Sequence, residues 1–411
     1  MARSFRRLQL VQAVFAVGFV ALIGRAAHVQ LLQGAHHATV AAAQRTERVE
    51  LPARRGTLFD RKGTALALTQ EVYHLGVAPN ELIDPPADTR TIAEVLGIPL
   101  RTVQQRLRAR WAYFAGPYNS LDVQPLRGMR GVHLEGEQVR FHPHPDLARS
   151  LLGHPAVEGR PASGMERVLD TLLAGTAGTA VVLRDRHGVR YESPARLDAF
   201  PRPGHDVYLT LDGDLQEIVE RALSDALEQY DATAGDMVVM DPVSGEVLAI
   251  ASAGRGGANA LTGVFEPGST AKLFAAAALL SHGLVSPLDS VSTEGGEYDL
   301  NGRVIHDDHP DEEWLDLAGV FQHSSNIGMV KLAARLTPEQ QYEMLRDFGL
   351  GTPTGVEYPA ESGGRLKPPA QWSGTTPASL AMGYELAVTA LQLAQAYAAV
   401  ANDGLMVQPT L

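Results

Sequence analysis

The longest apolar stretch of the chain lies near its N-terminus. Leu8 to Gly24 is almost wholly apolar. Arg25 to Leu32 lengthens the stretch, because the side chains of Arg25 and His28 can extend their polar ends to a membrane surface. About 17 residues rising ~1.5 Å each cover roughly 25 Å of a bilayer's hydrocarbon core. The pattern therefore predicts a transmembrane anchor over residues 8–32.

Charged residues in front of this stretch predict its orientation. Arg3, Arg6 and Arg7 precede it, and basic residues remain on the cytoplasmic side of a membrane helix. Residues 1–7 are thus expected in the cytoplasm, and the chain after the anchor on the outer, periplasmic side of the cytoplasmic (inner) membrane. A cleaved signal peptide is the alternative, but no small-x-small site closes a short apolar core.

Between the anchor and residue 200 the pattern becomes mostly extended. The predicted elements are a helix over 35–48, two short strands over 54–69 around a charged glycine turn, and two helices over 91–111 that break at Pro99. Pro201-Arg202-Pro203-Gly204 marks the expected boundary of this N-terminal domain. The charges around the glycine turn are interpreted as a structural ion-pair cluster.

Beyond the boundary, apolar residues repeat first at helical spacing and then in strand-like runs. Leu215 to Tyr230 has the helical pattern, with Glu217 and Arg221 as an i,i+4 pair. Asp236 to Met240 and Glu246 to Ser252 are apolar runs separated by turn residues, which predicts a hairpin. A length of 411 residues with 45% hydrophobic residues is enough for more than one domain.

A serine and a lysine stand at the start of the next predicted helix. Pro267-Gly268 is a turn signal, and the apolar run after it has no breaker until His282-Gly283, so a buried helix is expected to begin near Ser269. Ser269 and Lys272 then share one face of that helix. A serine hydroxyl becomes a nucleophile when a base removes its proton, and a lysine amine is such a base when its pKa is lowered. Ser269 is therefore a candidate acyl-enzyme nucleophile.

A second hydroxyl and an amide follow at a predicted loop-to-helix junction. Ser324-Ser325-Asn326 directly precedes the helical pattern of Ile327 to Leu336. At such a junction Ser324 can pass a proton to a leaving nitrogen, and Asn326 can hold a substrate amide. Ser-x-x-Lys alone is weak evidence, since it arises by chance about once every few hundred residues. The two motifs together favour a catalytic site.

Composition excludes some other functions. The net charge of -12 argues against a nucleic-acid partner, and the absence of cysteine excludes disulfides and thiolate metal sites. His142 and His144 alternate among prolines without an obvious third ligand. The run His306-Asp307-Asp308-His309 is interpreted as a solvated loop rather than a metal cluster. No metal and no cofactor are therefore predicted.

These motifs resemble those of the class B penicillin-binding proteins, most closely the cell-division type of peptidoglycan D,D-transpeptidase. The resemblance covers Ser-x-x-Lys with its Glu266-Pro267-Gly268 lead-in, Ser-x-Asn, the arginine-glycine and aspartate-arginine-x-glycine box within 54–63, and segments around 151–178 and 382–389. It implies that Ser269 attacks the penultimate D-alanine of a D-Ala-D-Ala stem peptide. Lys272 would be the base, Ser324 the proton relay, and both Ser324 and Asn326 would contact the substrate.

The resemblance also implies the fold. It predicts an α+β chain with a transmembrane helix, a mostly β, non-catalytic pedestal of the dimerisation type over 33–200, and a penicillin-recognising transpeptidase domain over 201–411, built on an antiparallel sheet flanked by helices. The family's third motif, Lys-Thr-Gly, does not occur in these 411 residues. The domain is thus expected to be incomplete at its C-terminus, and these residues alone to be inactive, because an oxyanion donor would be missing.

The implied partners are peptidoglycan stem peptides, β-lactams, the membrane, and a lipid II polymerase with other division proteins. Two alternatives are a division scaffold without chemistry of its own and a transpeptidase of the elongation type. A penicillin-sensing receptor domain is a third, less suited to a chain with a long pedestal.

Overall fold

A computed structural model describes residues 2–33, 46–157, 162–184, 190–254, 256–309 and 313–411. The chain divides into two compact units. The first contains residues 1–54 and 174–204, and the second contains residues 55–173 and 205–411.

The first unit contains the apolar N-terminal helix and a small sheet. Helix α1 (Ala2–Ala27) continues into a π-helical turn, His28–Leu32. Within it, Gln12–Gln30 is long and apolar enough to cross a membrane, with a mean hydropathy of 1.5. Side chains such as Phe15 and Val17 are 67% and 71% exposed. A helix that is apolar on all sides needs an apolar surrounding, so this one fits a membrane anchor.

The sheet of the first unit is antiparallel, with the strand order β1-β6-β7. Its strands are β1 (Thr46–Leu51), β6 (Gly178–Arg184) and β7 (Arg190–Ala199). The helix predicted over 35–48 is wrong at its end, because Thr46 to Arg48 pair with β6 as a strand. Residues 35–45 lie outside the described part of the chain.

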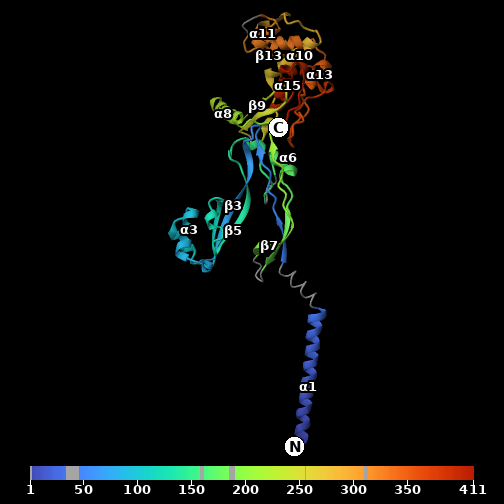
Figure 1. Ribbon diagram of the computed structural model, residues 1–411. Coiled ribbons are helices and arrows are strands. Elements are labelled where there is room, and N and C mark those ends of the chain that lie inside the picture. The colour runs from blue at the N-terminus through green and yellow to red at the C-terminus, as the bar shows by residue number, and fades with distance from the viewer. Residues whose placement is uncertain (1, 34–45, 158–161, 185–189, 255, 310–312) are drawn as a thin grey trace. The chain divides into compact units, whose positions relative to one another are not determined.

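In the second unit, one long strand organises the N-terminal half. Strand β3 (Ala65–Val77) pairs with β4 (Ala112–Asn119) and β5 (Val132–Phe141) along one part of its length and with β2 (Leu58–Phe59) along another, and β2 pairs with β8 (Val207–Tyr208). Helices α3 (Pro85–Leu96) and α4 (Leu100–Arg106) lie beside β3 and β5 in Figure 1. Their contact with the sheet buries Leu75, Ile92 and Phe114 completely. The glycine turn and the helix break at Pro99 are confirmed, but the second strand, expected over 64–69, continues to Val77, and residues 107–111 are not helical.

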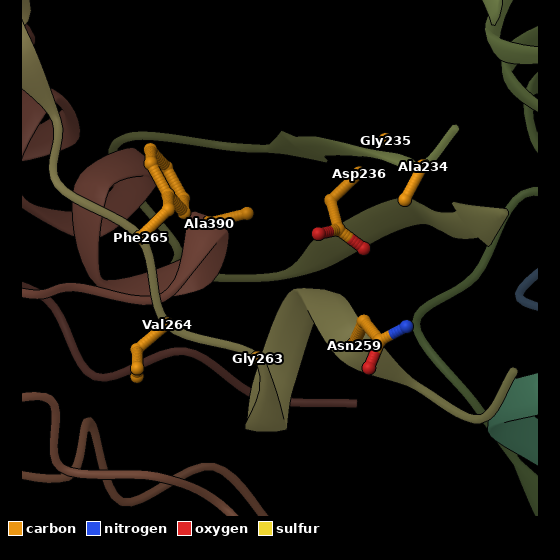
Figure 2. Close-up of a pocket in the computed structure, with 8 residues that line it drawn as sticks. All are labelled: Ala234, Gly235, Asp236, Asn259, Gly263, Val264, Phe265 and Ala390. Atoms are coloured by element: carbon orange, nitrogen blue, oxygen red, sulfur yellow. The ribbon is translucent and has the colours of Figure 1, made fainter. Parts of the chain in front are cut away.

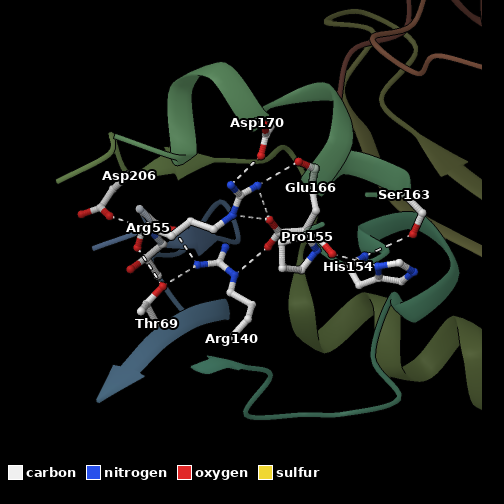
Figure 3. Close-up of polar contacts among 11 residues, drawn as sticks. Arg55, Thr69, Arg140, His154, Pro155, Ser163, Glu166, Asp170 and Asp206 are labelled. Carbon is white, nitrogen blue, oxygen red and sulfur yellow. Dashed lines mark hydrogen bonds and ion pairs between the residues drawn. The ribbon is translucent and has the colours of Figure 1, made fainter. Parts of the chain in front are cut away.

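Buried ion pairs hold this half together (Figure 3). The Glu166 carboxylate is fully buried in α6 (Gly164–Val168) and lies 2.6 Å from Nη2 of Arg55 and 2.6 Å from Nε of Arg140. Arg55 also contacts Asp170 at 2.6 Å. A buried carboxylate is tolerated when its charge is paired and its lone pairs are used. The two guanidinium groups therefore join two distant segments of the chain to one acid, so this cluster has a structural role.

The C-terminal half of the second unit opens with a helix packed on a hairpin. Helix α8 (Gly213–Gln229) lies against β10 (Val247–Ala253), which pairs with β9 (Gly235–Met240). The buried amide of Gln216 exchanges two 2.8 Å hydrogen bonds with the backbone of Ile250, which fixes the helix on the strand. The predicted hairpin and the Glu217–Arg221 pair, at 2.6 Å, are confirmed.

A cluster of helices follows, seen in orange and red in Figure 1. Its members are α10 (Lys272–Ser281), α11 (Leu317–Gln322), α12 (Asn326–Ala333), α13 (Pro338–Asp347), α14 (Thr376–Ala381) and α15 (Ala390–Ala401). Leu279 of α10 and Met329 of α12 are fully buried in one core between them. Phe274 on the same helix packs into a second core with Leu345 and Leu380. Helix α10 is therefore enclosed by its neighbours, and its N-terminus has a fixed place.

Candidate active site

Ser269 lies in the tight turn that leads into α10. Gly268–Ala271 is a 3₁₀ turn, and the α-helix begins at Lys272. The buried helix expected to begin near Ser269 is therefore confirmed, with a first turn that is 3₁₀ rather than α. The shared face is kept, because residues three apart in a 3₁₀ turn lie above one another. Ser269 is exposed, whereas Lys272 is only 1% exposed.

Lys272 is the centre of the polar contacts at this turn. Its Nζ lies 3.1 Å from Oγ of Ser269, 3.0 Å from Oγ of Ser324 and 2.5 Å from the Ser324 carbonyl oxygen. Burial lowers the pKa of Lys272 from 10.5 to about 8, although Asp307 and Asp308 act in the opposite direction. About a tenth of the amine is therefore unprotonated at pH 7, and its lone pair can take the Ser269 proton.

The second motif occupies the junction in front of α12, as the sequence predicts. Ser325 is the N-cap residue, and its Oγ accepts from the backbone N–H of Gly328. Ser324 directly before it has φ +51°, a left-handed conformation that non-glycine residues seldom adopt. In this conformation both the hydroxyl oxygen and the carbonyl oxygen of Ser324 accept hydrogen bonds from Nζ of Lys272. Asn326 begins the helix and donates from Nδ2 to the carbonyl oxygen of His306, at 2.9 Å.

One aspartate beside this motif has a role that the sequence interpretation missed. The Asp307 carboxylate accepts from Oγ of Ser325 at 2.5 Å and from the backbone N–H of Ile327 at 2.9 Å. The run His306 to His309 is therefore not simply a solvated loop. Asp307 is half-buried, and its carboxylate accepts hydrogen bonds from the residues directly before and after Asn326. No local signal identifies this residue, since it lies 18 positions before Ser325.

The chain matches two family models. Residues 235–411 match the penicillin binding protein transpeptidase domain, and residues 50–158 match the penicillin-binding protein dimerisation domain. The chain is 30% identical over 428 residues to the probable peptidoglycan D,D-transpeptidase PenA of Neisseria meningitidis, covering 97% of this chain and 72% of the relative. The chain belongs to the penicillin-binding protein transpeptidases. Its relatives are named peptidoglycan D,D-transpeptidases, and this chain contains a transpeptidase domain.

Other relatives agree with this assignment. The peptidoglycan D,D-transpeptidase FtsI of Escherichia coli K12 is 31% identical over 375 residues, covering 85% of this chain and 63% of FtsI. The crystal structure of penicillin binding protein 3 from Mycobacterium tuberculosis, complexed with ampicillin, superposes with a TM-score of 0.64 at 30% identity and covers 88% of this chain and 66% of that one. The mixed α/β fold with its dimerisation and transpeptidase domains is thus the fold of these proteins.

In this penicillin-binding protein, the backbone around 383–388 is hydrogen-bonded to the residues that precede Ser269. Phe265 and Val388 exchange backbone hydrogen bonds of 3.0 and 2.9 Å, and the N–H of Gly268 donates to the carbonyl oxygen of Gly383 at 3.0 Å. Gly383 has φ +84°, and a Cβ at this position would lie 1.9 Å from the Gly268 oxygen. Only glycine therefore permits this close approach to the residue that precedes Ser269.

Replacing Gly383 with alanine should disturb the site from outside it. The added methyl group must displace the serine turn and so break the hydrogen bond between Gly268 and Gly383. It also strains the backbone at φ +84°. We expect Gly383→Ala to lower the free energy of unfolding by about 2–4 kcal/mol and to slow acylation at Ser269. Urea unfolding and β-lactam acylation rates measure the two effects. Gly374→Ala, whose Cβ would meet open space, is the matched control and should change neither.

A cavity next to the same segment is separate from the serine site (Figure 2). Its lining residues are Ala234, Gly235, Asp236, Asn259, Gly263, Val264, Phe265 and Ala390. The side chains of Asp236 and Asn259 point into it, and within the described part of the chain Oδ1 of the first and Nδ2 of the second have no hydrogen-bond partner. None of the predicted site residues lines this cavity, so it does not hold the reacting atoms.

Proposed function

We propose that this chain cross-links peptidoglycan stem peptides through an acyl-enzyme on Ser269. The observation that carries the proposal is the buried amine of Lys272, held 3.1 Å from Oγ of Ser269 and 3.0 Å from Oγ of Ser324. A nucleophile within hydrogen-bond reach of a base, with the base oriented by a third group, is the arrangement that covalent acyl transfer needs. The shared chemistry of the named relatives supports the same reaction.

Each residue then has one task in the first half of the reaction. Oγ of Ser269 bonds to the penultimate D-alanine carbonyl carbon of a D-Ala-D-Ala donor while its proton moves to the Lys272 amine. The bond from that carbon to the terminal D-alanine nitrogen breaks, and the nitrogen receives the proton through the Ser324 hydroxyl. Asn326 holds the donor's peptide amide with its side chain. The products are free D-alanine and an ester on Ser269.

The second half returns the enzyme. An amine of a neighbouring stem peptide attacks the ester carbonyl and gives a proton back through the same groups, which forms the cross-link and frees Oγ of Ser269. β-Lactams present a strained amide to the same hydroxyl, so the proposal includes covalent inhibition by penicillins. No cofactor or metal takes part, since the Ser269, Lys272 and Ser324 side chains supply every proton transfer.

The test is acylation of full-length protein, purified in detergent, by a fluorescent penicillin. We expect one covalent label per chain, competed by other β-lactams, and release of D-alanine from a stem-peptide substrate. A scaffold without chemistry of its own, the alternative from another class, gives neither signal. Protein that is folded by circular dichroism but remains unlabelled would contradict the proposal.

We infer that the protein acts in septal wall synthesis beside a lipid II polymerase and other division proteins. Relatives that bear the name FtsI, and the cell-division character of the motifs, support this role over an elongation-type transpeptidase. Depletion in a growing culture tests the role. Division-type function predicts filaments with normal sidewalls, whereas elongation-type function predicts rounded cells.

The orientation of the anchor gives a separate prediction. With Arg3, Arg6 and Arg7 in front of the α1 helix, the chain after the anchor is expected on the periplasmic side. A reporter fused after Ala35 should therefore be active only outside the cytoplasm, as measured by paired alkaline phosphatase and β-galactosidase fusions. Changing the three arginines to glutamate should weaken this preference, and cytoplasmic activity of the unmodified fusion would contradict it.

A further inference from the structure

A carboxylate outside the predicted motifs, that of Asp307, helps to hold the junction that carries Ser324 and Asn326. Oδ2 of Asp307 accepts from Oγ of Ser325 at 2.5 Å, and Oδ1 accepts from the backbone N–H of Ile327 at 2.9 Å. The two bonds lie on either side of Asn326. Asp307 is itself fixed, because its N–H donates to the carbonyl oxygen of Gly296 at 3.1 Å. Its carboxylate thus clamps the first turn of α12 to the end of strand β13 (Arg303–His306).

This clamp bears directly on the Ser324 conformation. Ser324 has φ +51°, which a serine adopts only when its surroundings determine it. Ser325 cannot move without breaking the 2.5 Å bond to Asp307, and its side chain is 2% exposed. Ser324 lies directly before this fixed residue. The Oγ and the carbonyl oxygen of Ser324 are therefore held within hydrogen-bond distance of Nζ of Lys272.

Asp307 also acts on Lys272 through its charge. Asp307 and its neighbour Asp308 both raise the pKa of Lys272, while burial of the amine lowers it and is the larger effect. Among the described residues of this hairpin, His306 pairs with Glu297 at 3.6 Å, and the Arg303 guanidinium donates to Oγ of Ser379 at 2.7 Å. The anchoring effect and the charge effect can be separated, because no hydrogen bond to the Asp308 side chain accompanies its charge effect within the described residues.

We propose that Asp307 is a positioning residue for acylation, which holds the Ser324–Asn326 junction against Lys272 through its hydrogen bonds to Ser325 and Ile327. The proposal rests on the function proposed for Ser269. The negative charge of the aspartate is a second, separate effect, which favours the protonated form of Lys272. The residue does not touch the substrate in this role.

The experiment measures acylation of full-length protein by a chromogenic cephalosporin between pH 5.5 and 10. In the wild type the rate should rise with pH to a plateau with a midpoint of about 8. Asp307→Asn keeps the size and one acceptor but removes the charge, so the midpoint should move to lower pH with at most a few-fold change in the plateau. Asp307→Ala removes both bonds, and its plateau should fall at least tenfold.

Asp308→Asn is the matched control. It should move the midpoint in the same direction as Asp307→Asn but leave the plateau unchanged, because only the charge is lost. A wild-type plateau in Asp307→Ala, or a midpoint in Asp307→Asn that stays in place or rises, would overturn the proposal. If Asp307→Ala does not fold, the plateau of Asp307→Asn decides the positioning role, because the loss of one of the two bonds should lower it about twofold or more relative to Asp308→Asn. Wild-type protein that is not acylated at all would instead contradict the function proposed for Ser269.

Discussion

Ser269→Ala is expected to abolish covalent labelling by penicillin while the protein remains folded. The hydroxyl is exposed in the turn that leads into α10, and among the described residues its side-chain hydrogen bond is to Lys272, so its loss removes little packing. The change in the free energy of unfolding should stay within about 1 kcal/mol. Acylation requires the oxygen atom itself, because the ester forms on it. Intact-mass spectrometry after incubation with a β-lactam measures the adduct directly.

Ser281→Ala serves as the control for this experiment. Ser281 is the last residue of α10. It is exposed and lies at the opposite end of that helix from the serine turn. This variant should gain the mass of one β-lactam like the wild type. If Ser269→Ala gains the same mass, the nucleophile is another residue and the assignment of the site fails.

Lys272→Met is expected to lower the acylation rate at pH 8 by about 10²–10⁴-fold without making the protein less stable. Removing the base leaves the Ser269 hydroxyl without a proton acceptor, and general-base catalysis is worth about 10²–10⁴. The remaining rate should lose the midpoint near pH 8 that the lysine gives to the wild type. Lys272→Arg is the matched variant, because a guanidinium keeps the positive charge and cannot act as a base. A loss below tenfold in both variants would indicate a different base.

The stability of the same variant follows from the sign of the pKa shift. The folded chain releases the Lys272 proton at about pH 8, whereas an ordinary lysine holds it up to 10.5. Folding is therefore penalised below pH 8 by about 3 kcal/mol, a penalty that disappears as pH rises toward 10.5. The three hydrogen bonds of the ammonium offset part of it. Urea unfolding at pH 7 should show Lys272→Met equal to or up to ~3 kcal/mol more stable than the wild type.

Several local features of this protein follow from the sequence alone. The spacing of Ser269 and Lys272 places them together whether the turn is 3₁₀ or α, because residues three apart share a face in both geometries. The hairpin of β9 and β10, the helix α8 and the Pro99 break follow from short-range periodicity and turn residues. The resemblance of the motifs also identified the family, which two family models and the relatives confirm.

Tertiary packing decided what lies more than a few residues apart. Ser324 meets Lys272 because the cores around Leu279 and Met329 bring α10 and α12 together, and no local pattern encodes that distance. Gly383 supports Gly268 across more than a hundred positions of the chain, and the 1.9 Å approach that excludes a side chain is visible only in the folded structure. In the sequence Asp307 does not differ from other acidic loop residues. Only in the folded structure do its two carboxylate oxygens accept hydrogen bonds from Ser325 and Ile327. Sequence periodicity reports the environment of a residue's own helix or strand, whereas these contacts depend on how separate elements pack, so the motifs were predictable and the groups that hold them in place were not.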